Sequence, residues 1–389
     1  MESVYGEELE MFRDSVRQFF KRDVEPRLDE LANGTDDKFW KDAANAGLLG
    51  VVAPEEYGGY GAHPLAMVIV SEELGRSPAG PILGSCLNSD MTTMFMVMYG
   101  NEEQKRYWLP KFVSGEIIQA TALSEAGSGS DAGAMATKAV RDGDDIVING
   151  SKCWISNGNK ANKDGLIYIH AKLAPSDKGP GGPSIFLVPG GTPGVTTRYI
   201  PTMSFRGGDT AEIFLDDVRV PASSMLGEEG QGLKMFQPVI TLDRLMLCAR
   251  SMGAVDGAFE ATLEYVRDRK VFGQRLIDYQ NTQFKMAEFE TEIAVGRAFM
   301  NDAIRKWQAG EMTQKDAMML KIWLPEMECR VIDGMLQFWG GSGFSDETVI
   351  SKYYTAARVQ RIHAGATELQ KAMMGRLYTG QGRERKLEV

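Results

Sequence analysis

Hydrophobic positions recur every three to four residues from Glu7 to about Gly115, which is the spacing of one face of an α-helix. The first stretch shows this most clearly, with apolar side chains at Leu9, Phe12, Val16, Phe19 and Phe20. Proline and glycine interrupt the pattern at Val52–Gly61, so this segment is expected to be a loop between helices. The pattern therefore predicts a helical N-terminal region.

A different pattern extends from about Ile118 to Glu229. Short runs rich in β-branched residues alternate with turns rich in glycine and proline, such as Lys178–Pro183 and Gly190–Gly194. The runs are Asp145–Asn149, Leu166–His170, Ser184–Val188 and Glu212–Leu215. Such spacing is typical of strands joined by tight connections, and it predicts a small antiparallel sheet or barrel.

Long helical periods return from about Gln231 onward. They cover Leu245–Val266, Thr282–Trp307 and Thr313–Phe338, each of which is long enough for a helix bundle. No internal repeat interrupts this order of helices, sheet and helices. We therefore predict an α+β chain with an N-terminal helical domain (1–117), a middle antiparallel β-barrel or sheet domain (118–229) and a C-terminal four-helix bundle (230–389).

Composition and charge exclude several classes of partner. The 389 residues carry a formal net charge of −10 with acidic and basic residues interspersed, which argues against a nucleic acid. The four cysteines lack CxxC spacing and the three histidines lie far apart, so neither a metal site nor a disulfide framework is expected. The N-terminus shows no apolar signal core and no segment approaches the length of a membrane span, which predicts a cytoplasmic protein without a membrane partner.

Three distant segments share a further pattern: Ala122–Asp131, Asn149–Gly158, and Arg269–Gly273 followed by Gln280. They resemble the flavin-binding segments of the acyl-CoA dehydrogenases, and the resemblance extends over nearly the whole chain. The order of helices, sheet and helices is also that of this family. The resemblance implies FAD as the cofactor and an assembly through the C-terminal bundle, for which we expect a homotetramer.

The resemblance also implies residues that hold FAD. They are Leu123, Ser124, Gly129, Ser130, Trp154, Ser156, Arg269, Phe272, Gln280, Gln337 and Gly341. Glycines in the first segment let the backbone approach a ligand closely. Trp154 and Ser156 are two apart on a predicted strand and should share one face, although a core tryptophan is the alternative. Arg269 should reach the pyrophosphate of a neighbouring subunit's FAD, with a surface salt bridge as the alternative.

The last family segment, Ile362–Leu369, has Ala364 where most members carry their catalytic glutamate. Dehydrogenation of an acyl-CoA removes an α-proton while a hydride leaves the β-carbon, so the site needs a carboxylate near the α-carbon. Alanine has none, but its backbone N–H can still donate to the thioester oxygen. The resemblance places substrate contacts at Ser130, Arg244, Ala364 and Gly365.

Two aspartates are candidates for the missing base. Asp243 precedes Arg244 at the position where the isovaleryl and long-chain enzymes carry their glutamate. Because aspartate is one methylene shorter, the substrate or the helix would have to shift by roughly an ångström. The ordinary alternatives for Asp243 are a carboxylate in the first turn of a helix and a salt-bridge partner of a nearby arginine.

The second candidate, Asp90, lies in Leu87–Met96, which resembles the far wall of the family's acyl pocket. A subgroup that acts on cyclohexene carboxyl-CoA esters uses an aspartate of this wall for a 1,4-elimination. The alternative is a helix N-cap or an exposed loop.

The sequence thus predicts an FAD-dependent acyl-CoA dehydrogenase in which an aspartate, Asp243 first, abstracts the proton and an enoyl-CoA forms. Electron-transfer flavoprotein is the expected electron acceptor. One alternative is an alicyclic dehydrogenase with Asp90 as the base. Another is a flavin oxidase or monooxygenase on the same fold, and a non-catalytic flavoprotein would follow if both aspartates faced solvent.

Overall fold

The computed structural model describes residues 4–84 and 86–381, without the side chains of residues 88–90. It divides into two compact units. Met1–Leu28, Leu65–Gly84 and Thr241–Val389 form the first, which we call the helical unit, and Asp29–Pro64 and Ser85–Ile240 form the second, the sheet unit.

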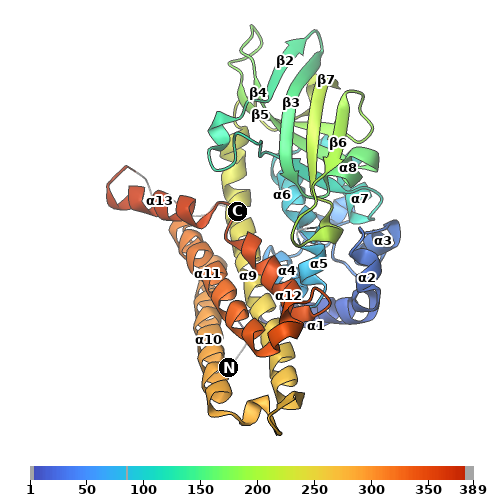
Figure 1. Cartoon of the computed structure of the whole chain (residues 1–389). Coiled ribbons are helices and arrows are strands. Elements are labelled where there is room, and N and C mark those ends of the chain that lie inside the picture. The colour runs from blue at the N-terminus through green and yellow to red at the C-terminus, as the bar shows by residue number, and fades with distance from the viewer. Residues whose placement is uncertain (1–3, 85, 382–389) are drawn as a thin grey trace. The chain divides into compact units, whose positions relative to one another are not determined.

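The sheet unit contains an eight-stranded sheet, visible as green and yellow arrows in Figure 1. The strand order is β6-β7-β3-β2-β4-β5-β8, and β1 pairs with β4. The bounds are β1 Gln119–Ala122, β2 Lys138–Asp142, β3 Asp145–Ile155, β4 Leu166–Leu173, β5 Gly182–Pro189, β6 Val195–Tyr199, β7 Ala211–Pro221 and β8 Met225–Leu226. All four predicted strand runs fall within these strands.

The ladders are antiparallel except for two, because β1 and β2 both pair with β4 in parallel. Strand β4 is buried along almost its whole length, and its first four residues, Leu166–Ile169, are hydrophobic without alternation. The predicted antiparallel sheet is therefore correct for most ladders. Helix α8, Gly158–Asp164, connects β3 to β4. Isoleucines, valines and alanines from the inner face form one core.

Short helices complete the sheet unit. They are α2 Leu28–Leu31, α3 Asp37–Asn45, α6 Ser89–Tyr99 and α7 Glu102–Val113. Helix α7 begins with a capping box, in which Asn101 and Gln104 each accept a hydrogen bond from the other's backbone N–H.

The helical unit contains the long helices. Their bounds are α1 Glu7–Phe19, α4 Leu65–Arg76, α5 Gly80–Leu83, α9 Gly232–Asp268, α10 Gln280–Gln308, α11 Gln314–Trp339, α12 Val349–Gln360 and α13 Thr367–Tyr378. A hairpin of β9 (Lys270–Val271) and β10 (Gln274–Arg275) joins α9 to α10. The three predicted C-terminal helical periods are confirmed, although α9 starts 13 residues before Leu245, with Pro238 inside it.

Glycines let α4 and α9 approach each other at backbone distance. A Cβ added to Gly253 would lie 1.9 Å from the Glu72 carbonyl oxygen, and one added to Gly257 would lie 2.2 Å from that of Arg76. From the other side, a Cβ on Gly75 would lie 2.2 Å from the Arg250 carbonyl oxygen. The two helices therefore touch along a seam that no larger residue could occupy.

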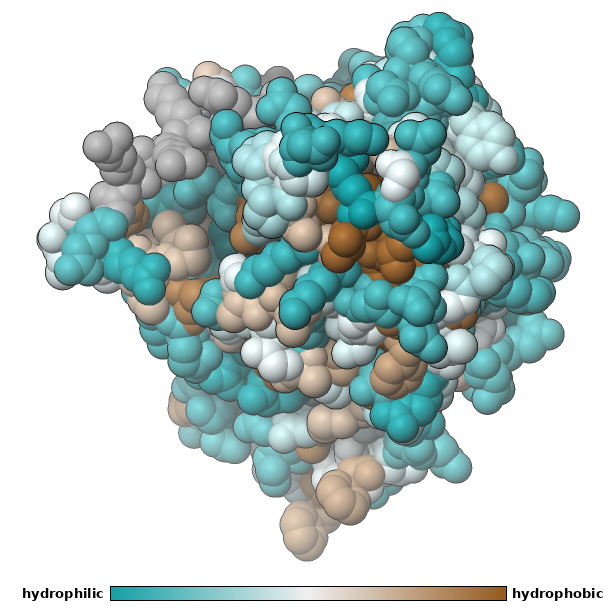
Figure 2. All heavy atoms as spheres, turned by 90° about the horizontal axis from the view of Figure 1, so that it is seen from above, coloured by the Kyte–Doolittle hydropathy of each residue, from teal (hydrophilic) through white to brown (hydrophobic). Residues whose placement is uncertain are grey.

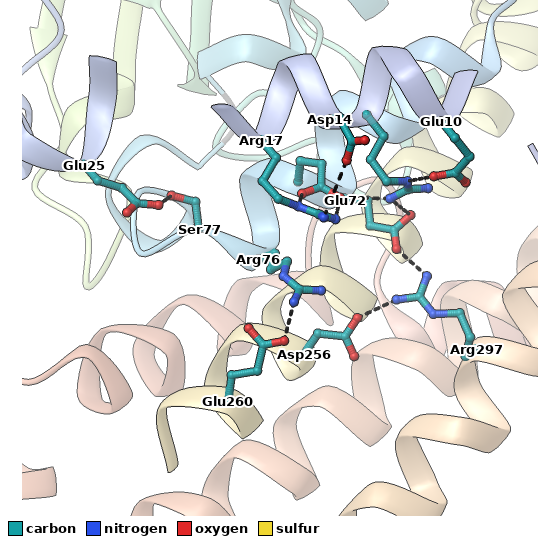
Figure 3. Close-up of polar contacts among 12 residues, drawn as sticks. Glu10, Asp14, Arg17, Glu25, Glu72, Arg76, Ser77, Asp256, Glu260 and Arg297 are labelled. Carbon is teal, nitrogen blue, oxygen red and sulfur yellow. Dashed lines mark hydrogen bonds and ion pairs between the residues drawn. The ribbon is translucent and has the colours of Figure 1, made fainter. Parts of the chain in front are cut away.

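A network of charged side chains crosses from α4 to α1, α9 and α10 (Figure 3). Glu72 is buried and pairs with Arg297, which also donates to Asp256 at 2.6 Å. Arg13 on α1 lies 3.2 Å from the same Glu72 carboxylate. Burial alone would raise the pKa of Glu72, but Arg297 and Arg13 hold that pKa below its usual range. The network joins four helices through charges that are paired on burial.

The surface seen from above is mainly hydrophilic, and hydrophobic residues occupy small, separated areas (Figure 2). Within residues 4–84 and 86–381, no helix combines the length and the apolar composition that a membrane crossing requires. The same residues contain no group of three or more histidine, cysteine or acidic side chains that could hold a metal ion.

Candidate active site

Asp243 lies about three turns into α9. The first-turn interpretation of this carboxylate is therefore wrong, because the helix begins at Gly232. Only 7% of the residue is exposed. In the part of the chain that the structure describes, no cationic group lies within 4.0 Å of its carboxylate, so the salt-bridge alternative is not observed either.

The surroundings of Asp243 bring the pKa of its carboxyl close to neutral pH. Burial raises the pKa of Asp243 to about 6, and the positive charges of Arg250, Arg244 and Lys321 oppose the rise. A carboxylate with a pKa near the working pH can take up a proton and release it again, which is what a general base requires.

Arg244, the next residue along α9, contacts the turn that carries Ala364. Its Nε donates a hydrogen bond to the Ala364 carbonyl oxygen at 3.2 Å. Gln370 Nε2 donates to the Gly365 carbonyl oxygen at 3.2 Å and approaches that of Ala364 at 3.4 Å. We call residues 361–366, between α12 and α13, the 361–366 turn. Two helices thus hold its carbonyl groups in place.

The backbone of this turn is strained at the position of the usual glutamate. Ala364 has φ +51° and Gly365 has φ +94°. A positive φ is unfavourable for alanine, so the surrounding contacts must impose it. Among the residues that the structure describes, the Ala364 N–H has no acceptor. The turn therefore presents the Ala364 N–H as a free backbone donor, at the position that the resemblance assigns to the thioester oxygen.

Behind the turn lies a polar cluster that the sequence analysis missed. Lys321 Nζ donates to the backbone carbonyl oxygen of Gln360, the last residue of α12. Arg250 Nη2 donates to Gln360 Oε1 at 3.3 Å, and His363 Nε2 lies 2.6 Å from the same oxygen. Burial, Arg250 and Lys321 hold the pKa of His363 well below its usual range, so the ring is neutral.

Two signals in the sequence could have revealed this cluster. Arg250 follows Asp243 by seven residues, so both lie on one face of α9. Lys321 interrupts the apolar run Ala317–Leu324 of α11. A cation at a core position of a helix needs a buried partner, which is itself a reason to examine it.

In the sheet unit, the structure brings two of the predicted flavin segments together. Lys152 Nζ donates to the Leu123 carbonyl oxygen at 3.2 Å and to Glu125 Oε1 at 2.8 Å, and Cys153 N donates to the Ser124 carbonyl oxygen at 2.9 Å. Glu125 also accepts bonds from the backbone of Ala136 and Thr137. Burial would raise the pKa of Glu125, but Lys152 and the other donors lower it to about 2.

The glycines of this loop face open space. A Cβ added to Gly127 or Gly129 would meet no atom within 4 Å, and Ser130 beside them is exposed. Backbone groups in such a position are accessible to the phosphates or ring of a cofactor. The loop therefore fits the role that the resemblance gave it.

Trp154 differs from the sequence-based expectation in its backbone. It has φ +65° at a shift of register between β3 and β7, and β3 ends at Ile155, before Ser156. Trp154 and Ser156 were predicted to share one face of a regular strand. That prediction is wrong, because the alternation of side chains stops at the register shift. The side chain of Trp154 is 61% exposed, so it is not a core tryptophan.

The predicted cofactor residues of the helical unit are exposed. Phe272, at the tip of the β9–β10 hairpin, has φ +49° and is fully exposed. Arg269 has no carboxylate within 4.0 Å in the described ranges, so its surface salt bridge is not observed. The side chains of Gln280 and Gln337 and the backbone of Gly341 are exposed as well. An exposed aromatic ring next to an exposed arginine suits a ligand with an adenine ring and phosphates.

Asp90 lies in α6 of the sheet unit. Its side chain is outside the residues that the structure describes.

Three family models match the chain in sequence. They are the acyl-CoA dehydrogenase N-terminal domain at residues 6–116, the middle domain at 120–218 and the C-terminal domain at 230–378. A long-chain specific acyl-CoA dehydrogenase of mitochondria from Sus scrofa is 35% identical over 377 residues, which are 96% of this chain and 87% of the relative.

Solved structures agree with the sequence matches. An acyl-CoA dehydrogenase from Geobacillus kaustophilus superposes with a TM-score of 0.89 at 35% identity, covering 96% of this chain and 98% of the other. A glutaryl-CoA dehydrogenase from Mycobacterium smegmatis in complex with FADH2 gives a TM-score of 0.87 at 28% identity, covering 98% and 96%. The chain belongs to the acyl-CoA dehydrogenase family. It is an FAD-dependent oxidoreductase.

Proposed function

We propose that this chain oxidises an acyl-CoA thioester to the enoyl-CoA with Asp243 as the base. The observation that carries the proposal is the buried carboxylate of Asp243, which lies next to Arg244 while Arg244 holds the carbonyl of Ala364. The usual glutamate is absent from that turn, and a carboxylate with a pKa of about 6 stands on the neighbouring helix.

In the proposed reaction the Ala364 N–H donates a hydrogen bond to the thioester oxygen, which stabilises negative charge as the α-proton leaves. Asp243 takes that proton. Bound FAD supplies the hydride acceptor for the β-hydrogen. Arg244 and Gln370 hold the carbonyl groups of Ala364 and Gly365, which keeps the turn in its strained conformation.

The groups proposed to hold FAD come from both units. Leu123, Ser124, Gly129, Ser130, Trp154 and Ser156 belong to the sheet unit, and Arg269, Phe272, Gln280, Gln337 and Gly341 belong to the helical unit. We assign the second set to the FAD of a neighbouring subunit. Large exposed aromatic side chains support an assembly, since Phe272 is 100% and Phe344 94% exposed.

We further propose a cytoplasmic homotetramer that passes its electrons to electron-transfer flavoprotein. Light scattering after size exclusion tests the tetramer. Re-oxidation of the substrate-reduced enzyme in air tests the acceptor: it should be slow, whereas rapid formation of hydrogen peroxide would indicate an oxidase.

The decisive experiment is anaerobic bleaching of the flavin by a panel of straight, branched and alicyclic acyl-CoA esters. Asp243→Asn should abolish bleaching while FAD stays bound, and Asp243→Glu should retain part of the rate. Full bleaching by Asp243→Asn refutes Asp243 as the base. Asp90→Asn is the parallel variant, and loss of bleaching in that variant alone would move the base to Asp90 and favour an alicyclic substrate.

A further inference from the structure

Lys321 is a fully buried cation in the middle of α11. It is 0% exposed, and in the described part of the chain no carboxylate oxygen lies within 4.0 Å of its Nζ. Burying an ammonium group away from water is costly unless the site compensates for it. The compensation in this structure comes from a helix end and from charges at longer range.

The helix end is the C-terminus of α12. Lys321 Nζ donates to the carbonyl oxygen of Gln360, the last residue of that helix, where the unpaired carbonyl groups carry partial negative charge. Arg250 reaches the same residue through the Gln360 side chain and also donates to the Gly84 carbonyl oxygen at 2.8 Å. The 361–366 turn begins directly after this clamped residue, so the two cations fix the point from which the turn starts.

The same two cations act on Asp243, and Arg250 lies two turns further along the same face of α9. Arg250 and Lys321 both act on the charge of its carboxylate, as does Arg244. One pair of buried side chains therefore contacts Gln360, directly before the turn that carries the amide donor, and also acts electrostatically on the carboxylate on α9.

We propose that Lys321, supported by Arg250, is a positioning residue for this reaction, which fixes the turn that carries the Ala364 N–H and keeps the buried Asp243 carboxylate ionised. The inference rests on the proposed role of Asp243 as the base. It assigns to α11 a part in catalysis that requires no contact with the substrate.

The other titratable groups around the pair leave this assignment intact. Burial raises the pKa of Glu328, on α11, to about 7, so most of it is neutral at pH 6. Burial also raises the pKa of Cys248, on α9, to about 12, and His363 in the turn is neutral because its pKa is depressed. Near pH 6 the charged groups that face Asp243 are thus the cations, and removing one should raise the pKa of its carboxyl.

The test is the holoenzyme with Lys321→Met, assayed by the second-order rate of flavin bleaching at low substrate, which reports the ionisation of the free enzyme. Loss of one buried charge should move the acid limb of the pH profile upward by about one unit. Ionisation alone would then lower the rate about fivefold at pH 6 and hardly at pH 8. A purely structural effect would lower the rate equally at both values.

A second readout does not depend on activity. Thermal midpoints of the parent and of its Asp243→Asn variant are measured without substrate over a range of pH. The difference between the two midpoints changes at the pH where the Asp243 carboxyl titrates. In the Lys321→Met background this change should move to higher pH by the same amount. If Lys321→Met does not fold, Lys321→Gln provides the same test with a polar side chain, and Lys321→Arg should keep the profile of the parent.

Two controls separate the causes. Lys306→Met removes a lysine that pairs with Asp316 at the start of α11, so it weakens the same helix and should leave the acid limb in place. Glu328→Gln should also leave the acid limb of the pH profile in place. A shift of the limb in that variant would assign the titration to Glu328 and overturn the inference. An unmoved limb in Lys321→Met, with bleaching still abolished by Asp243→Asn, overturns the inference alone. Full bleaching of the flavin in Asp243→Asn refutes Asp243 as the base, and with it the proposed function on which the inference rests.

Discussion

Replacing Asp243 by asparagine should stabilise the folded protein above pH 6 while it removes the reaction. Asparagine resembles the protonated acid in size and in lack of charge, so the variant avoids the cost of holding a carboxylate in a buried site. That cost follows from the pKa of Asp243, which rises from its ordinary value of 3.8 to about 6. A rise of about 2.2 units corresponds to about 3 kcal/mol, as an upper estimate.

The sign determines the pH window. A raised pKa in the folded state means that the stability contribution of Asp243 is fully present below pH 3.8 and is lost as the pH rises through about 6. The parent and Asp243→Asn should therefore unfold alike near pH 4 and diverge up to about pH 7. The expected difference at pH 7.5 is a thermal midpoint a few degrees higher for the variant.

The assay is differential scanning calorimetry of both holoenzymes from pH 4 to 8. Asp316→Asn is a control of opposite sign, because Asp316 accepts bonds from Thr313 and Lys306 at the start of α11. Burial would raise the pKa of Asp316, but Lys306 and Thr313 hold it below its usual range. This variant should lose about 1 kcal/mol at pH 7 and little at pH 3. If Asp243→Asn is equally or less stable than the parent at pH 7.5, burial of the Asp243 carboxylate does not destabilise the fold, and the reasoning is refuted.

Three more predictions concern other parts of the structure. Ala364→Gly should raise the thermal midpoint by the equivalent of about 1 kcal/mol, because glycine adopts φ +51° without strain, and flavin bleaching should continue since the backbone donor remains. Glu125→Gln should release FAD during gel filtration, because the buried Lys152 ammonium loses its counter-charge and the loop at Leu123 loses its anchor. Glu72→Gln should lower the thermal midpoint at pH 7 and much less below pH 4, since a depressed pKa means that its stabilising effect disappears on acidification.

Each of these has a contradicting outcome. An unchanged or lower midpoint for Ala364→Gly would mean that the positive φ is not a strained conformation. Normal FAD retention by Glu125→Gln would show that the loop is held by other contacts. An effect of Glu72→Gln that persists at pH 3 would assign its role to packing and not to charge.

Hydrophobic spacing predicted the long helices and the strands well, because each of these elements buries one face in a core of its own unit. Helical periods were expected from about Gln231, close to the start of α9 at Gly232, but the first period was placed only from Leu245, beyond Pro238. The parallel pairing of β4 with β1 and β2 was also beyond the pattern, because a strand that is buried on both sides loses its alternation. The domain boundaries at 117/118 and 229/230 stay a prediction.

Residues of the candidate site that belong to a sequence motif could be predicted. Residues that reach the site only through tertiary contacts could not. Asp243 and Ala364 could be named from the resemblance, and the structure shows that Arg244 connects their two segments. Lys321 could be noticed as a cation in an apolar run, but its partner could not be predicted, because the run gives no indication of the helix end that the side chain meets. Trp154 was placed on a regular strand because a change of register has no signature in the residues themselves.

The glycine seam between α4 and α9 has a consequence for the range of possible substrates. A helix pressed backbone to backbone against its neighbour has no freedom to advance towards a ligand, and Ser71 Oγ further ties α4 to the Met246 carbonyl oxygen. The proposed base, Asp243, has a short side chain on this fixed helix, so its reach is fixed as well. Substrate selectivity would then follow from where each acyl-CoA places its α-carbon and not from movement of α9.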